Sequence, residues 1–189
     1  MSKINIPASS KNHTRKALQR GFSNVQIAIG ILVTIILLLG ALSGYQYIQQ
    51  AKVNNEVSAL TDLRAATVRY GQFAAPFNAN NANIPVLANL NFFESSGFAV
   101  DRVANPATVS NQWGGLVTVA VANNGNALAF TFNGVPRDAC RELGTKLDNI
   151  ATDISIDGVA TKVAGGRSNP ALVAANCAEP SIMIYTIAR

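Results

Sequence analysis

The pattern of apolar and polar positions is dominated by one long apolar segment near the start of the chain. Between Arg20 and Lys52 the sequence has no Asp, Glu, Lys or Arg, and from Ile27 to Leu42 it is apolar apart from glycines and Thr34. A hydrocarbon core about 30 Å thick takes about 20 helical residues. Only a helix satisfies its own backbone hydrogen bonds in lipid as a single segment. The pattern therefore predicts a helix that spans, or is inserted in, a membrane.

The pattern changes after Lys52 and becomes amphipathic. The apolar positions that recur at steps of three and four are Val53, Val57, Leu60, Ala65 (or Arg64) and Val68. This spacing predicts that the helix continues with one face packed on a globular domain. Lys52, Glu56, Asp62 and Arg69 are expected among the polar positions, with a weak pair between Lys52 and Glu56. Gly71 and Pro76 end the pattern, so we expect one helix of about 50 residues.

The remaining residues predict short strands and helices. Residues 74–112 are rich in Asn, Ala and Pro, and indicate an irregular connection with short elements, anchored by the apolar segments 90–93 and 98–103. Further on, the expected elements are strands at 116–122 and 127–132 joined by a hairpin at 123–126, a helix at 136–148, a short strand within 150–156, a loop at 160–172, a helical turn at 171–176 and a final strand at 181–188. The fold class is therefore α+β.

Charge is concentrated at the start of the chain. Residues 1–20 hold five of the 15 basic residues and no acid, which leaves ten basic against ten acidic residues in the rest. Basic residues beside an apolar helix keep that side cytoplasmic, so the bulk of the chain is expected to be exported. The basic leader explains the formal charge of +5, and the balanced remainder has no basic patch that would indicate a nucleic acid partner.

Candidate chemistry is sparse. Cys140 and Cys177 are the only cysteines, and the one histidine, His13, lies in the leader. In an exported chain this favours a disulfide over a metal site, with two free buried thiols as the alternative. No nucleophile–base pair or carboxylate cluster stands out, so we expect neither an enzyme nor a cofactor. Trp113 is expected in the core rather than as a binding platform, and Gly114-Gly115 at the start of a strand rather than as a phosphate loop.

The residues just before the apolar helix are more specific. Arg20-Gly21-Phe22, after a long basic leader and before an uncharged helix, resembles the cleavage site of a type IV prepilin. The resemblance implies that prepilin peptidase cuts between Gly21 and Phe22 and that Phe22 becomes the N-methylated first residue. The family usually has Glu at the fifth mature position, which here is Gln26. This position is implied to set the assembly register, and Gln can hydrogen-bond a neighbouring subunit's amine without supplying a charge.

The C-terminal half is similar to the type IVb subclass, whose members include the bundle-forming and toxin-coregulated pilins. The features are the segment Asn111-Gln112-Trp113-Gly114-Gly115 before a strand, the hairpin around Asn124, a helix carrying Cys140, and Cys177 before the last strand. The implied fold is a long N-terminal helix packed on a small antiparallel sheet with a disulfide-closed C-terminal region. The implied parts are a leader at 1–21, an apolar transmembrane or filament-core helix at 22–50, its amphipathic half at 51–73 and a globular domain at 74–189.

The resemblance implies a structural role. The expected function is a subunit that polymerises with copies of itself, through its N-terminal helix, into an extracellular pilus used for adhesion, aggregation, or conjugative or DNA transfer. Its implied partners are prepilin peptidase and the assembly machinery of the inner membrane, where the precursor resides. The alternatives are a pseudopilin of a type II secretion system, a minor pilin, and a membrane-anchored binding domain that never polymerises.

Overall fold

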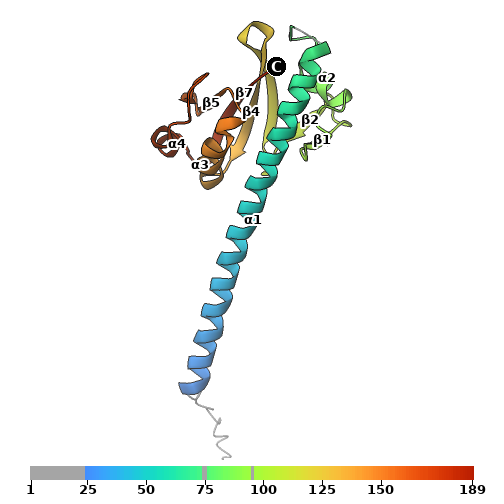
Figure 1. Ribbon diagram of the computed structural model, residues 1–189. Coiled ribbons are helices and arrows are strands. Elements are labelled where there is room, and N and C mark those ends of the chain that lie inside the picture. Colours follow the sequence, from blue (N-terminus) through green and yellow to red (C-terminus); the bar gives the residue numbers. More distant parts are fainter. Residues whose placement is uncertain (1–23, 74–75, 95) are drawn as a thin grey trace, which may run out of the picture. The chain divides into compact units, whose positions relative to one another are not determined.

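The computed structural model describes residues 24–73, 76–94 and 96–189 (Figure 1). The chain divides into two units, residues 1–43 and 44–189. Helix α1 (Asn24–Phe73) is one element of 50 residues. No proline occurs between Pro7 and Pro76, so no residue within α1 lacks the backbone N–H that each helical turn needs. The helix ends at Phe73, shortly before Pro76.

One antiparallel sheet organises residues 44–189. Its strands are β1 (Ala99–Asp101), β2 (Thr108–Ser110), β3 (Leu116–Ala122), β4 (Ala127–Val135), β5 (Asp153–Ile156), β6 (Val159–Lys162) and β7 (Ser181–Ala188). They lie in the order β1-β2-β3-β4-β7-β5-β6. The other elements are helices α2 (Ile84–Asn89), α3 (Arg137–Lys146) and α4 (Pro170–Asn176), with 3-10 turns η1 (Asn123–Gly125) and η2 (Leu147–Asn149). The expected α+β class, the hairpin β3–β4 and the final strand are confirmed.

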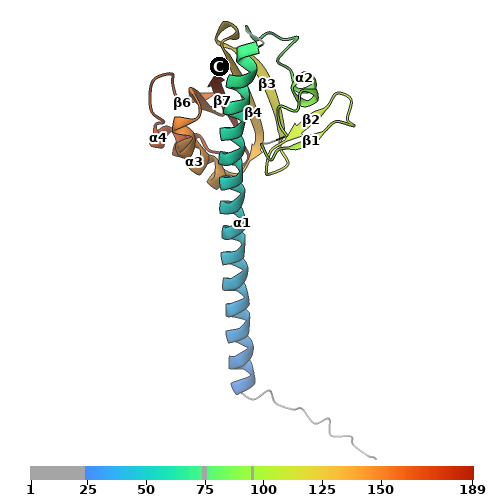
Figure 2. The same cartoon turned by 45° about the vertical axis from the view of Figure 1, so that its right-hand side comes forward.

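The C-terminal strand β7 is an inner strand of the sheet. It pairs with β4 on one side and with β5 on the other, both antiparallel. Figures 1 and 2 show α3 and α4 on one side of the second half of α1, and α2 with β1 and β2 on the other. The last residues of the chain therefore hold the two halves of the sheet together.

The core lies between the sheet and the helices. In β4 the side chains of Leu128, Phe130 and Phe132 are buried, whereas Ala129 and Thr131 between them are half-buried, as period-two alternation requires. The same core cluster includes residues of α1, α3, α4 and β7, among them Leu60, Leu143, Val173 and Tyr185. One helix-covered face of the sheet thus supplies a single core.

The β3–β4 hairpin is closed by residues in the left-handed region. Asn123 and Asn124 have φ of 49° and 54°, and Gly125 has φ of 86°, a conformation that Asn and Gly tolerate best. Gly125 is also needed for space, because a Cβ there would lie 2.7 Å from the carbonyl oxygen of Phe77. The backbone N–H of Phe77 donates to the Gly125 carbonyl at 2.9 Å. The hairpin tip is therefore tied to the segment that follows α1.

The buried stripe of α1 differs from the predicted one. The side chains on it that are fully or almost fully buried are Val53, Glu56, Ala59, Leu60, Leu63 and Thr67. Ala65 and Val68, predicted to face the core, are exposed, and Glu56, predicted among the polar outer positions, is 0% exposed. The prediction is confirmed for Val53 and Leu60. It was wrong for Ala65, Val68 and Glu56, because the polar residues Glu56 and Thr67 lie on the inner stripe. Thr67 is accommodated because its hydroxyl donates to the Leu63 carbonyl at 2.8 Å.

Other differences concern edges and anchors. The predicted loop at 160–172 contains most of β6, an edge strand that the turn at Asp157 and Gly158 returns along β5. Edge strands need no apolar alternation, so the sequence pattern did not indicate it. Strand β4 continues beyond Phe132 to Val135 through a register shift, and the next strand begins only at Asp153. Of the predicted apolar anchors, Leu90 and Val103 are exposed, whereas Phe92, Phe93 and Phe98 are buried.

Replacing Leu63 by Ala is expected to lower the free energy of unfolding by about 3 kcal/mol, because a fully buried leucine leaves a cavity. Val103→Ala is the control, since that side chain is 95% exposed and should change the free energy of unfolding by less than about 0.5 kcal/mol. Urea unfolding of the whole chain in detergent, followed by the fluorescence of Trp113, measures both. Equal losses in the two variants would contradict the burial of this face of α1.

Candidate assembly surface

The apolar half of α1 is exposed along its described length. The large apolar side chains from Ile27 to Leu39 are between 48% and 67% exposed, with Val33 at the lower limit and Leu37 at the upper. Among the described residues, α1 is the one helix long and apolar enough to cross a membrane. Soluble monomers rarely expose a contiguous apolar surface of this extent. The segment therefore needs a membrane or other apolar helices around it.

The hydroxyl of Thr34, within the apolar segment, is satisfied inside the helix. The hydroxyl of Thr34 donates to the carbonyl oxygen of Gly30 at 2.8 Å. Such a bond to the preceding turn removes the cost of placing a hydroxyl in lipid or between apolar helices. The helix can therefore exchange one apolar environment for another without leaving the Thr34 hydroxyl unpaired.

The site residues predicted near the start of the chain fall largely outside the described part. Gly21 and Phe22 lie outside the described residues. The backbone of Gln26 lies in the first turn of α1. Its side chain, like Gly21 and Phe22, falls outside the described part of the structure. Cleavage, methylation and the assembly register remain predictions.

The predicted disulfide is present. Cys140 in α3 and Cys177 at the end of α4 are bonded, with a Cα–Cα distance of 5.8 Å and a sequence separation of 37. Both are buried. Closing a loop of this length stabilises the folded domain by about 4 kcal/mol in the chain-entropy model. The bond fixes α3 to the segment that leads into β7.

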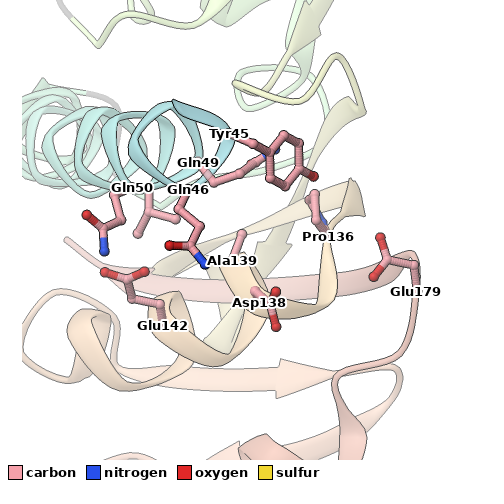
Figure 3. Close-up of a pocket in the computed structure, with 10 residues that line it drawn as sticks. Tyr45, Gln46, Gln49, Gln50, Pro136, Asp138, Ala139, Glu142 and Glu179 are labelled. Atoms are coloured by element: carbon pink, nitrogen blue, oxygen red, sulfur yellow. The ribbon is translucent and has the colours of Figure 1, made fainter. Parts of the chain in front are cut away.

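A groove lies where α1 passes α3. It has a volume of about 380 Å³ and is lined by Tyr45, Gln46, Gln49, Gln50, Val53, Pro136, Asp138, Ala139, Glu142 and Glu179. In Figure 3 the side chains of Gln46 and Gln50 in α1 point toward α3, which carries Asp138 and Glu142, and Glu179 lies near Pro136. The lining thus contains three carboxylates and no basic side chain. We call it the acidic groove.

Polar contacts hold the elements around this groove. Lys146 pairs with Glu142 at 2.6 Å and donates to the side-chain oxygen of Asn54 in α1 at 2.9 Å. On the other side of α1, the indole N–H of Trp113 donates to Gln49 at 3.2 Å. Both contacts orient α1 relative to the sheet and α3, so the groove is a defined surface of residues 44–189.

The Asn-Gln-Trp-Gly-Gly segment has a structural role. The side-chain oxygen of Asn111 accepts the backbone N–H groups of Trp113 and Gly115 at 3.0 and 2.9 Å. Its amide donates to the carbonyl of Asn133 in β4 at 2.8 Å. Trp113 is half-buried and packs against the core. The segment therefore forms the turn that starts β3, as the sequence predicted for the two glycines.

Glu56 is the residue that sequence reasoning missed. Its Oε2 accepts the backbone N–H of Gln112 at 3.2 Å, whereas Oε1, within the described part of the chain, has no hydrogen-bond partner. Burial raises the pKa of Glu56 from 4.5 to about 7, although the Gln112 N–H lowers it in part. The signal in the sequence was its spacing, three residues after Val53 and four before Leu60.

Tyr185 in β7 shares the environment of Glu56. Its hydroxyl donates to the sulfur of Met183 at 3.0 Å. Burial raises the pKa of Tyr185 well above its usual value, and negative charge on Glu56 raises it further. Tyr185 therefore stays neutral and adds no second negative charge beside the Glu56 carboxyl. Among the described residues, no group of three His, Cys, Asp or Glu side chains could hold a metal ion.

The fold and this exposed helix define a class of protein. The crystal structure of a type IVb pilin from Salmonella typhi is similar with a TM-score of 0.58 and 18% identity, over 72% of this chain and 99% of that chain. TcpA, a type IV pilin from Vibrio cholerae El Tor biotype, matches with a TM-score of 0.49 and 13% identity, over 72% of this chain and 98% of that chain. The likeness to the Salmonella typhi structure shows that the chain has the type IVb pilin fold, with its long helix, antiparallel sheet and disulfide.

The family follows from the sequence comparison. A family model described as PilS N terminal matches residues 50–188, which is more than half of the chain. The chain therefore belongs to this family, and the resemblance to type IVb pilins is confirmed. A search of curated proteins finds no match to the sequence.

Glu56→Gln should flatten the pH dependence of stability. Between pH 4.5 and about 7 the folded chain retains a proton on Glu56 that the unfolded chain has lost, so the free energy of unfolding of the parent chain falls as the pH rises. The loss amounts to up to about 3 kcal/mol. Gln still accepts the Gln112 N–H and does not titrate. Unfolding measured at several pH values should show the two chains diverging above pH 4.5. If the free energies of unfolding of the two chains changed in parallel with pH, the raised pKa of Glu56 would be contradicted.

Proposed function

We propose that this chain is a structural subunit of a type IVb pilus and that it polymerises through the apolar half of α1 into an extracellular filament. The observation that carries the proposal is the exposure of the apolar side chains from Ile27 to Leu39. The family and the pilin fold support a pilin subunit. In this role the chain is not a catalyst, and its domain forms the outer shell around a core of packed helices.

Maturation prepares the helix for this role. In our proposal the basic leader, residues 1–21, remains on the cytoplasmic side while the rest is exported. Prepilin peptidase removes the leader after Gly21 and methylates Phe22. The apolar helix is retained at 22–50, and its amphipathic half at 51–73 packs on the globular domain at 74–189. The cleaved subunit remains in the inner membrane until it is assembled.

The energetics explain why assembly needs a machine. Burying apolar surface from water is worth about 25 cal/mol per Å², but lipid tails are as apolar as the side chains of neighbouring helices. Moving the helix from lipid to the filament core therefore gains little from the hydrophobic effect. Close packing, contacts between domains and work done by the inner-membrane assembly machinery have to supply the rest.

Gln26 is proposed to set the register of the helices. If Phe22 becomes the first residue, Gln26 lies one helical turn into the mature chain, and its amide oxygen can accept a hydrogen bond from the terminal amine of a neighbouring subunit. A charged hydrogen bond is stronger than a neutral one. A carboxylate at this place would therefore bind the amine more tightly, and we expect Gln26→Glu to assemble at least as well as the parent chain.

Cleavage is testable by one substitution. Gly21→Glu should block processing, because it places a bulky charge at the cleaved bond. The exported parent chain should begin at Phe22 and carry one added methyl group, whereas the variant should retain its leader. Mass spectrometry of the membrane fraction measures both, with Gln19→Ala as a control that should mature normally. If the parent chain kept its leader, cleavage would be contradicted, and the alternative of a membrane-anchored domain that never polymerises would be supported.

Polymerisation needs a separate assay. Shearing of cells that produce a tagged chain should release it in long filaments visible by electron microscopy. Cells carrying Gly21→Glu should release none, because an uncut leader keeps each helix anchored in the membrane. Recovery of the mature chain from the membrane alone, with no filaments, would contradict the pilus subunit and leave a non-polymerising anchored domain.

A further inference from the structure

The second half of α1 carries an apolar stripe that the sheet of its own chain does not cover. A shallow groove along this stripe is lined by Thr61, Arg64, Ala65, Val68, Arg69 and Gln72. Val68 is 38% exposed. These positions follow one another at helical spacing on the side of α1 away from the buried stripe. The amphipathic pattern of the sequence therefore contains apolar residues that folding of one chain leaves unused.

The uncovered surface continues to the end of the helix. A second groove, lined by Ala66, Arg69, Tyr70, Phe73, Leu90, Asn91 and Phe92, shares Arg69 with the first. Phe73 is 83% and Leu90 54% exposed. We call the two grooves together the outer face of α1. Its apolar side chains are of the kind that a protein interface covers.

The charges on the outer face are all positive. No acidic residue lines either groove, and in the described part of the chain neither Arg64 nor Arg69 takes part in an ion pair. Arg64 is oriented by a hydrogen bond from its guanidinium to the carbonyl of Asn149 at 2.7 Å. The outer face is thus an apolar strip with two guanidinium groups along it.

The acidic groove has the opposite character. Its carboxylates are Asp138, Glu142 and Glu179, and apolar parts of Tyr45, Pro136 and Ala139 lie between them (Figure 3). Asp138 and Glu179 form no ion pair within the described residues, and Glu142 pairs with Lys146. Each chain therefore presents both members of a complementary pair of surfaces. Complementary charge of this kind selects a partner and its orientation.

We propose that the outer face of α1 binds the acidic groove of a second copy of this chain, with Arg69 meeting Asp138 or Glu179. The inference rests on the proposed function and names the surfaces through which the domains meet. Because the two surfaces differ, the contact is heterologous, and contacts of this kind repeat into an open helical filament. The α1 residues of the two surfaces span 45–53 and 61–73, so their centres lie 18 residues, or about 27 Å at 1.5 Å per residue, apart. Successive contacts therefore advance along the helix axis.

Charge reversal tests the pairing. Arg69→Glu and Asp138→Arg should each lower the yield of sheared filaments at least tenfold, because each places like charges against one another. The chain with both substitutions should recover most of the yield. Each contact between two copies then pairs Glu at position 69 of one copy with Arg at position 138 of the other, so opposite charges meet again. Arg167→Glu is the matched control, because Arg167 is an exposed residue outside both surfaces, and it should assemble normally.

Cross-linking tests contact directly. Arg69→Lys retains the charge and introduces an amine that a carbodiimide can couple to a carboxylate in direct contact. Filaments assembled from isotopically labelled and unlabelled chains should yield cross-linked peptides that join position 69 of one copy to Asp138, Glu142 or Glu179 of another. Arg167→Lys should yield none to these residues.

The outcomes separate this inference from the proposed function. Filaments formed at parental yield by Arg69→Glu, or normal filaments of Arg69→Lys without the expected cross-link, overturn the pairing while the pilus subunit stands. Failure of the parent chain to form filaments overturns the proposed function itself. Circular dichroism of each variant in detergent checks that it folds, so a loss of filaments from a folded single variant with rescue by the second substitution supports the pairing.

Discussion

The structure depends on one constraint, which is that a single helix has to satisfy two environments. The first half of α1 exposes apolar side chains in every direction, whereas the second half buries a stripe that includes Leu60 and Leu63 against the sheet. Water is unfavourable for the first half and necessary for much of the second. The boundary between the two halves therefore sets where the globular domain begins.

The packing of α1 on the sheet contains an uncompensated acid. Glu56 is fully buried and accepts one hydrogen bond from a backbone N–H. The neutral Tyr185 lies in the same environment. A buried carboxyl of this kind stays protonated at a cost, or ionises at a larger one. The same stability would be reached more simply with an apolar residue. The carboxyl connects α1 to the turn that begins β3, and that hydrogen bond is the gain offsetting part of its cost.

The C-terminal region closes the domain from the other side. Strand β7 pairs with both β4 and β5, and the disulfide of Cys140 and Cys177 anchors the segment just before it. Contacts between residues far apart in sequence are costly to form in chain entropy, and the covalent bond reduces that cost. The domain that results places the acidic groove where α1 passes α3 and leaves the outer face of α1 uncovered on the same chain.

The sequence alone determined the features that depend on local pattern. The apolar helix, the hairpin around Asn124, the final strand and the pairing of the only two cysteines could all be predicted, because each has a signal within a few residues or has no competitor. Only the tertiary structure decided which stripe of α1 is buried, that Glu56 lies on it, that β6 exists, and that Val68 and Phe73 remain uncovered. These properties arise from contacts between distant segments. Helical periodicity identifies faces, but the partner determines which face is inside.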